Sequence, residues 1–177
     1  MRNKILSNKA YPVIFLAVIV TVAVVLLIAV NSVTSSIVES RKAEEVKNTL
    51  ENIFPGIDRY EIEDEVYIVY QDDNRIGYAF MADGSGYGGD IEILVGLDNN
   101  FGIAGISILA QTETPGLGSR ITESSFTDQF KGLSVSDIAL ASEGGKIDAI
   151  TGATISSRAV VDAIREKMIE ILDNLEK

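Results

Sequence analysis

The hydrophobic pattern of the chain begins with one long apolar run. Val13 to Val30 is a stretch of 18 residues in which Thr21 is the only polar member. As an α-helix this stretch is about 27 Å long at roughly 1.5 Å per residue, which approaches the hydrocarbon thickness of a bilayer. We therefore predict a transmembrane anchor helix at residues 12–31.

A buried core helix and a cleaved signal peptide are the alternatives for this run. A core helix needs no unbroken apolar sequence. A signal peptide usually has about 7–15 apolar residues before a small-residue cleavage site, whereas this run is longer and its exit at residues 29–31 is a poor cleavage sequence. Arg2, Lys4 and Lys9 precede the run. By the positive-inside rule we expect residues 1–11 in the cytoplasm and the rest of the chain outside the membrane.

Beyond the run, the pattern changes from helix to strands and back to helices. An apolar stripe predicts a juxtamembrane helix at residues 32–56, which Pro55 and Gly56 end. The next fifty residues are rich in β-branched and aromatic side chains separated by short polar turns, which favours an antiparallel arrangement. The predicted strands are residues 66–71, 76–81, 91–97 and 103–109.

The last third of the chain predicts mostly helices. We expect a loop at residues 111–120, a short helix at 123–130 and two strand-like pieces at 138–141 and 146–150. A long helix follows at 155–175, with apolar residues along one face. This order predicts an α+β fold, in which residues 57–177 form a compact domain with a mainly antiparallel sheet and flanking helices.

Composition excludes several classes of function. The 15 Lys and Arg residues against 26 Asp and Glu give a net charge of −11, which opposes binding to nucleic acid through phosphates. The chain has no Cys and no His. Disulfides, thiolate or imidazole metal sites, iron–sulfur clusters and Cys or His nucleophiles are therefore excluded. We find no paired carboxylates that predict a hydrolase, and we expect no metal site and no catalytic residue.

The junction before the last helix carries the clearest chemistry. It reads Asp148-Ala-Ile-Thr151-Gly152-Ala153-Thr154, a hydroxyl-rich turn at a helix N-terminus, where unpaired N–H groups attract anions. Gly152 and Ala153 would let a phosphate approach the backbone, and Thr154 stands where an N-cap is expected. A plain helix cap after a glycine turn explains the same residues equally well.

The motif resembles the flavinylation sequence Asp-x-x-Ser/Thr-Gly-Ala-Thr of FMN-binding domains. In that family, a separate magnesium-dependent flavin transferase joins FMN to the last Thr through a phosphoester. The resemblance implies that Thr154 is the acceptor, that Thr151, Gly152 and Ala153 surround the phosphate, and that Asp148 is read by the transferase or orients the turn. Ser156 follows as a further hydroxyl near the phosphate or in the first helical turn.

A second motif, Glu-Thr114-Pro-Gly-Leu117-Gly, occupies residues 113–118. With the anchor and the flavinylation sequence, it makes the whole chain similar to the G subunit of the Rnf electron-transport complex. The C subunit of the sodium-pumping NADH:quinone oxidoreductase is a more distant match. The resemblance implies that Thr114 hydrogen-bonds the flavin ring and that Leu117 packs on it, although a simple surface turn is the alternative. The glycine-rich residues 84–89 predict a hairpin turn, in which Tyr87 could reach a flavin face.

The resemblance implies a specific role for the protein. It would be an electron-relay subunit of a membrane-bound, ion-translocating ferredoxin:NAD oxidoreductase, with covalent FMN on the extracytoplasmic side and other membrane subunits of the complex as partners. The isolated chain would carry electrons without a catalytic site of its own. Two alternatives are an anchored FMN domain that serves a different membrane reductase, and a non-redox binding module in which Thr154 is only a helix cap.

Overall fold

The computed structural model describes the backbone of residues 11–175 and the side-chain surroundings of residues 13–29 and 41–174. Apart from Tyr11, the predicted cytoplasmic residues 1–11 lie outside the described part of the chain. Residues 45–177 form one compact unit, and residues 1–44 are assigned to a separate one.

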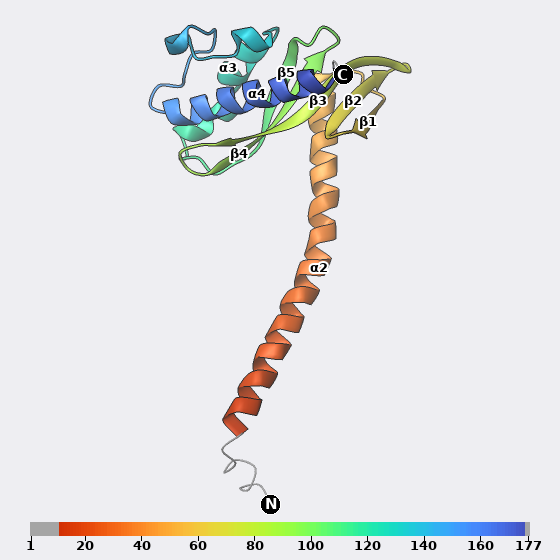
Figure 1. Cartoon of the computed structure of the whole chain (residues 1–177), viewed down its shortest axis with the longest axis vertical. Coiled ribbons are helices and arrows are strands. Elements are labelled where there is room, and N and C mark those ends of the chain that lie inside the picture. Colours follow the sequence, from red (N-terminus) through yellow and green to blue (C-terminus); the bar gives the residue numbers. More distant parts are fainter. Residues whose placement is uncertain (1–10, 176–177) are drawn as a thin grey trace, which may run out of the picture. The chain divides into compact units, whose positions relative to one another are not determined.

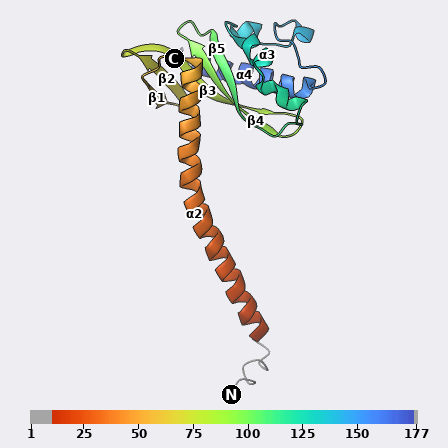
Figure 2. The same ribbon diagram turned by 180° about the vertical axis from the view of Figure 1, so that it is seen from behind.

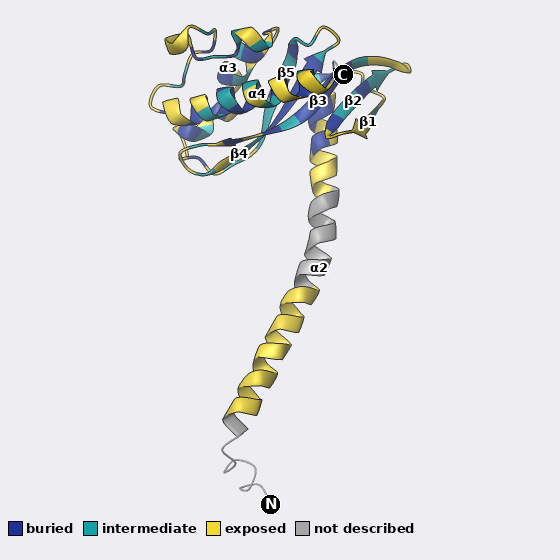
Figure 3. Cartoon of the chain, in the orientation of Figure 1, coloured by how far each residue is buried: buried dark blue, intermediate teal, exposed yellow. Residues whose placement is uncertain are grey.

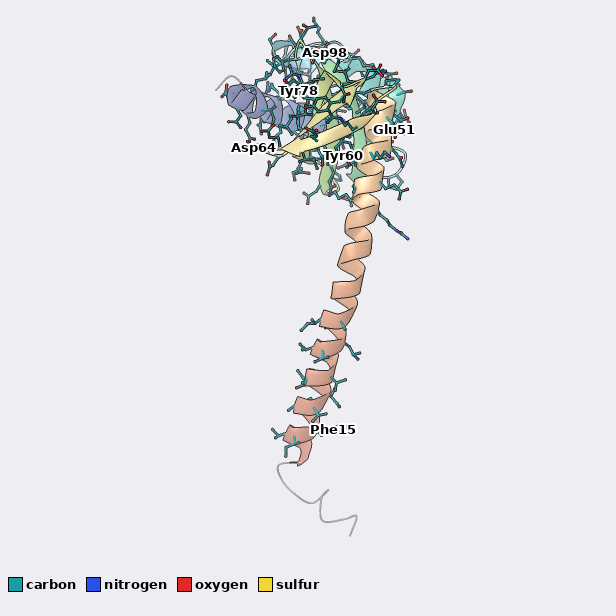
Figure 4. All side chains as sticks on the ribbon, turned by 90° about the vertical axis from the view of Figure 1, so that its right-hand side faces the viewer. Phe15, Glu51, Tyr60, Asp64, Tyr78 and Asp98 are labelled. Carbon is teal, nitrogen blue, oxygen red and sulfur yellow. The ribbon has the colours of Figure 1, made fainter. Side chains whose placement is uncertain are left out.

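The first described element is α2, a helix from Tyr11 to Ile53. The predicted anchor and juxtamembrane helices are thus parts of one continuous helix, which ends just before Pro55 and Gly56, as predicted. The large apolar side chains of residues 13–28 are all at least 47% exposed, and they point outward around the helix, as Phe15 does in Figure 4. In the described part of the chain, no helix combines the length and the apolar character that a membrane crossing requires.

The centre of the compact unit is a five-stranded sheet in the order β1-β2-β3-β4-β5 (Figure 1). Each strand is antiparallel to the next, which confirms the predicted arrangement. β3 continues four residues past its predicted end, because Gly84 lets the strand pass close under the last helix: a Cβ at this position would lie 2.8 Å from the carbonyl oxygen of Ala159. The strands are Arg59–Glu63, Val66–Gln71, Asn74–Ser85, Asp90–Asp98 and Ile103–Gln111.

Alternate residues of the strands point to opposite faces of the sheet, and each face is covered. The last helix, α4 (Thr154–Leu175), packs on one face. The end of α2 covers the other through Val46, Leu50 and Phe54 (Figure 2). In Figure 3, α4 has a buried side toward the sheet and an exposed side. Its buried residues include the whole stripe predicted from the sequence up to residue 171: Val160, Ile164, Met168 and Ile171.

The connection from β5 to α4 contains short helical turns instead of strands. They are Gly118–Thr122, α3 (Ser124–Thr127), Asp128–Phe130, Val135–Asp137 and Ala141–Glu143. The helix predicted at 123–130 is confirmed as α3 with the turn that follows it.

The strands predicted at residues 138–141 and 146–150 are wrong, because these segments form only one parallel bridge, between Leu140 and Ile147. Both residues are buried as the apolar pattern required. The chain nevertheless turns back at Gly144, whose φ is +88°, and at Gly145, where a Cβ would lie 2.0 Å from the carbonyl oxygen of Ala139. The turn is too tight for a longer ladder to form.

Candidate functional site

Ala153 and Ser157 order the turn that leads into α4. The Ala153 carbonyl accepts the Ser157 N–H at 2.9 Å, which makes Ala153 the N-cap residue. The Ser157 hydroxyl accepts a bond from the Ile150 N–H and donates one to the Ala153 carbonyl, both at 3.0 Å. Thr154 is therefore the first residue inside the helix. The sequence analysis expected Thr154 at the N-cap, which is the position that Ala153 holds.

This arrangement leaves Thr154 without a structural partner. Its side chain is exposed, and within the described residues its hydroxyl makes no hydrogen bond. The backbone N–H groups of Thr154, Ile155 and Ser156 also have no acceptor there, as expected for the first turn of a helix. An accessible hydroxyl and three free donors thus share one helix end.

This helix end forms one wall of a pocket of about 450 Å³. Three segments that are distant in the sequence line it: the β3–β4 turn, the loop after β5 and the start of α4. The lining residues are Tyr87, Glu113, Thr114, Leu117, Gly118, Gly152, Ala153, Thr154, Ile155 and Ser156. Most of the residues that we predicted from the two motifs therefore meet at one site.

Asp148 and Thr151 do not line this pocket, and both are exposed. The backbone of Asp148 is held by the side-chain amide of Gln129, which accepts the Asp148 N–H at 2.7 Å and donates to its carbonyl at 3.3 Å. The Asp148 carboxylate itself has no partner within the described part of the chain. The motif thus presents its first residue on the surface beside the pocket.

The rim of the pocket is apolar. Tyr87 is 73% exposed, Ile155 58% and Leu117 43%. Leu117 lies over the turn at Gly152, where φ is +83° and a Cβ would lie 2.9 Å from Leu117 Cδ1. The sequence analysis missed Ile155, although its place off the apolar stripe of α4 was a usable signal.

The sequence analysis also missed Glu113. Only 5% of this residue is exposed, and its carboxylate accepts the Ser156 hydroxyl at 2.7 Å and the Gly88 N–H at 3.0 Å. The Ser156 side chain, predicted near the phosphate, is therefore committed to Glu113. No Lys or Arg is among the residues that line the pocket. The closest cation in the sequence of α4, Arg158, pairs with Glu143 at 2.6 Å.

Comparisons with known proteins agree with this site. The model of the FMN-binding domain family matches residues 86–168, which contain the pocket. The chain is 35% identical to the G subunit of the ion-translocating oxidoreductase complex of Methanosarcina acetivorans, over 86% of this chain and 88% of that protein. It is 33% identical to the G subunit of the Na⁺-translocating ferredoxin:NAD⁺ oxidoreductase complex of Acetobacterium woodii, over 78% and 69%.

A solved structure shares the fold. The crystal structure of NqrC from Shewanella oneidensis superposes with a TM-score of 0.50 and 24% identity, over 58% of this chain and 54% of that one. The relatives bear out the resemblance to the Rnf G subunit that the two motifs carried. By its similarity to the Methanosarcina protein over most of both chains, this chain belongs to the family of G subunits of ion-translocating oxidoreductase complexes, and it contains an FMN-binding domain.

Proposed function

We propose that this protein is an electron-relay subunit of an Rnf-type complex and carries FMN as a phosphoester on Thr154. The observation that carries the proposal is the exposed Thr154 hydroxyl, which has no partner among the described residues and borders the pocket. In a threonine that served only as a helix cap, the hydroxyl oxygen would accept a hydrogen bond from a backbone N–H. Here Thr154 lies inside the helix and its hydroxyl accepts no N–H among the described residues, so the non-redox alternative loses its explanation of Thr154.

The phosphate of the flavin would lie at the start of α4. The free N–H groups of residues 154–156 and the positive end of the helix dipole favour a negative group at this position. A phosphodiester keeps one negative charge, which these groups can hold without a lysine or arginine. Gly152 and Ala153 line the pocket beside these groups.

The ring system would occupy the pocket. Its volume of about 450 Å³ falls in the range of roughly 300–1,000 Å³ that is usual for cofactor sites. Tyr87, Leu117 and Ile155 supply apolar contacts at the rim, and Thr114 supplies a hydroxyl inside it. When bound, FMN accepts and donates electrons singly or in pairs; the chain contributes the position and surroundings of the ring.

Attachment would be a phosphoryl transfer carried out by a separate flavin transferase. The Thr154 Oγ–H bond is replaced by an Oγ–P bond, and the flavin must come from an activated nucleotide such as FAD. The phosphoanhydride bond of FAD breaks, AMP leaves, and the proton passes to the transferase or solvent. The exposed Asp148 and Thr151 lie outside the pocket, where the transferase can read them.

The membrane role rests on the family and on α2. Subunits of ion-translocating complexes work at a membrane, and the exposed apolar side chains of residues 13–28 would be buried in lipid. The bases before this stretch favour a cytoplasmic N-terminus and an extracytoplasmic flavin domain. Ferredoxin:NAD oxidoreduction, the activity in the name of the Acetobacterium relative, would be the reaction of the whole complex. The other membrane subunits would be the partners of this chain.

The test is to produce the full chain together with a flavin transferase and to analyse it by mass spectrometry. We expect one FMN on the peptide containing residues 147–158, fluorescence that survives denaturation, and loss of both in Thr154→Ala. Ser142→Ala, at an exposed hydroxyl outside both the motif and the pocket, is the control and should keep the flavin. An unmodified Thr154 in protein that had access to the transferase would overturn the proposal. For the flavin-bearing protein, the subunits that co-purify with it from membranes would distinguish an Rnf complex from another reductase.

A further inference from the structure

We propose that Glu113 is the positioning residue of the flavin site: its buried carboxylate holds the three pocket segments in the geometry that presents Thr154. This inference rests on the proposed function and concerns a residue that takes no direct part in the phosphoester. Glu113 directly precedes Thr114, but its own side chain is turned inward and is 5% exposed.

The two carboxylate oxygens of Glu113 bind two different segments. Oε2 accepts the hydroxyl of Ser156, in the first turn of α4, at 2.7 Å. Oε1 accepts the N–H of Gly88, in the β3–β4 turn, at 3.0 Å. The backbone of Glu113 belongs to the third segment, the loop after β5. Because hydrogen bonds to a carboxylate are stronger than those between neutral groups, one side chain links all three walls of the pocket.

Glycines pack against this carboxylate from two sides. A Cβ at Gly86 would lie 2.0 Å from Oε1, and a Cβ at Gly118 would lie 2.5 Å from Oε2. At Gly88, a Cβ would lie 2.3 Å from the Thr112 carbonyl oxygen. Gly86 and Gly118 therefore leave the space that the Glu113 carboxylate occupies, and Gly88 lets the β3–β4 turn approach the backbone of residues 112–113.

The link to Ser156 fixes the start of α4. Ser156 is the third residue of the helix and Thr154 the first, so anchoring Ser156 sets the rotation of the turn that carries the Thr154 hydroxyl and the free N–H groups. The carboxylate also lies at the positive end of the helix dipole, where a negative charge is favourable. Glu113 thus orders the acceptor turn before any nucleotide is present.

Two substitutions of Glu113 distinguish the effect of its hydrogen bonds from the effect of the space that its side chain fills. Glu113→Ala leaves the Gly88 N–H and the Ser156 hydroxyl without their acceptor. Glu113→Gln keeps the shape, an acceptor oxygen for Gly88 and an amide that can donate to Ser156. Ser156→Ala removes only the hydrogen bond from α4 to Glu113. It replaces Glu113→Ala in the experiment if that variant fails to fold. Glu166→Gln, on the exposed side of α4, is the control for loss of one negative charge.

The experiment measures the initial rate at which purified flavin transferase, with FAD and Mg²⁺, labels the folded full-length protein. We expect Glu113→Ala and Ser156→Ala to be labelled about tenfold more slowly or worse, because a displacement of about 1 Å at a reacting group can cost ~100-fold. Glu113→Gln should recover most of the rate, and Glu166→Gln should equal the wild type. Wild-type rates in both Glu113→Ala and Ser156→Ala would overturn the inference.

A second readout needs no flavin. Hydrogen exchange of the unloaded protein should be faster in Glu113→Ala at Ser157, Gly86 and Gly88, whose N–H groups are hydrogen-bonded in the wild type. It should be near wild type in Glu113→Gln. Unchanged exchange in Glu113→Ala would contradict the positioning role. If the wild type itself takes up no flavin, the proposed function fails, while the exchange measurement still decides whether Glu113 orders this turn.

Discussion

Ser156 donates its hydroxyl to Glu113 Oε2 at 2.7 Å, across 43 positions of the sequence. Both residues are buried, at 2% and 5% exposure. The bond joins the start of α4 to the loop after β5, so the flavinylation motif and the 113–118 motif are two halves of one site. Changes in either motif should therefore affect the other.

Thr154→Ala should leave the fold almost unchanged. Because the Thr154 hydroxyl is exposed and makes no hydrogen bond among the described residues, we expect the free energy of unfolding to change by no more than about 0.5 kcal/mol. Chemical denaturation of the unloaded protein measures this. A loss of about 1–2 kcal/mol would mean that Thr154 caps the helix after all.

Ser157→Ala should be much more damaging. The substitution leaves the Ile150 N–H without its acceptor and removes the bond to the Ala153 carbonyl, so we expect a loss of about 1–3 kcal/mol in unfolding free energy. Ser142→Ala, at an exposed serine, is the control and should be neutral. If the two variants were equally stable, the hydrogen bonds of the Ser157 hydroxyl would make no contribution to the stability of the domain.

Gly118→Ala should disturb the site from within. The new methyl group would lie 2.5 Å from Glu113 Oε2 and 3.0 Å from Ser156 Oγ, and such overpacking costs about 1–3 kcal/mol. We expect a lower melting temperature and slower flavin attachment. Gly105→Ala is the matched control, since its methyl group would meet only ordinary contacts at 3.5 Å and beyond. Rapid attachment in Gly118→Ala would show that the pocket tolerates the shift.

Tyr87→Leu should change the environment of the attached flavin without preventing attachment. Tyr87 lies on the exposed rim of the pocket, and a tyrosine in contact with a flavin ring quenches its fluorescence by electron transfer. We expect the same flavin content by mass and a higher fluorescence yield per flavin. Tyr70→Leu, on β2 away from the pocket, should leave the yield unchanged. An equal yield in Tyr87→Leu and wild type would place the ring elsewhere.

The stability of the segment that leads to α4 should depend on acid pH. The Lys146 ammonium, 3.0 Å away, and the Ser134 hydroxyl, 2.9 Å away, lower the pKa of Asp137 below its usual value. A lowered pKa in the folded protein stabilises it above the unfolded value of about 3.9, and this contribution is lost as the pH falls through the folded value.

Asp137→Asn should therefore lower the melting temperature at pH 7, and the difference from wild type should disappear as the pH falls through the lowered pKa of Asp137. Because the Lys146 side chain is 61% exposed and that of Asp137 30%, high salt should reduce the effect. Melting curves followed by circular dichroism between pH 2 and 7 measure it, with Asp83→Asn as the control. A difference that persists at the lowest pH would exclude the ion pair as its source.

Much of the fold follows from local patterns in the sequence. The β-branched segments of residues 59–110, separated by short polar turns, favoured the antiparallel arrangement that the sheet has, and the stripe of α4 identified its buried face. The prediction of strands around the apolar residues Leu140 and Ile147 was wrong, because burial alone does not distinguish a strand from a compact loop. What decided the outcome was the close contact of Gly145 with Ala139, which no periodicity reveals.

The candidate site was predictable where its chemistry is local. Thr154, Gly152 and Leu117 were identified from contiguous motifs. Glu113 was not, because the burial of a carboxylate depends on partners 25 and 43 positions away. The N-cap was predicted one residue too late for a related reason. Thr is a common N-cap residue, and only the bond from the Ser157 N–H to the Ala153 carbonyl shows that Ala153 holds that position.

The unengaged hydroxyl of Thr154 has a consequence for biogenesis. No hydrogen bond within the described domain uses the Thr154 oxygen, so under the proposed attachment the polypeptide would finish folding before its nucleotide arrives. A maturation enzyme would then meet a completed surface instead of a nascent chain.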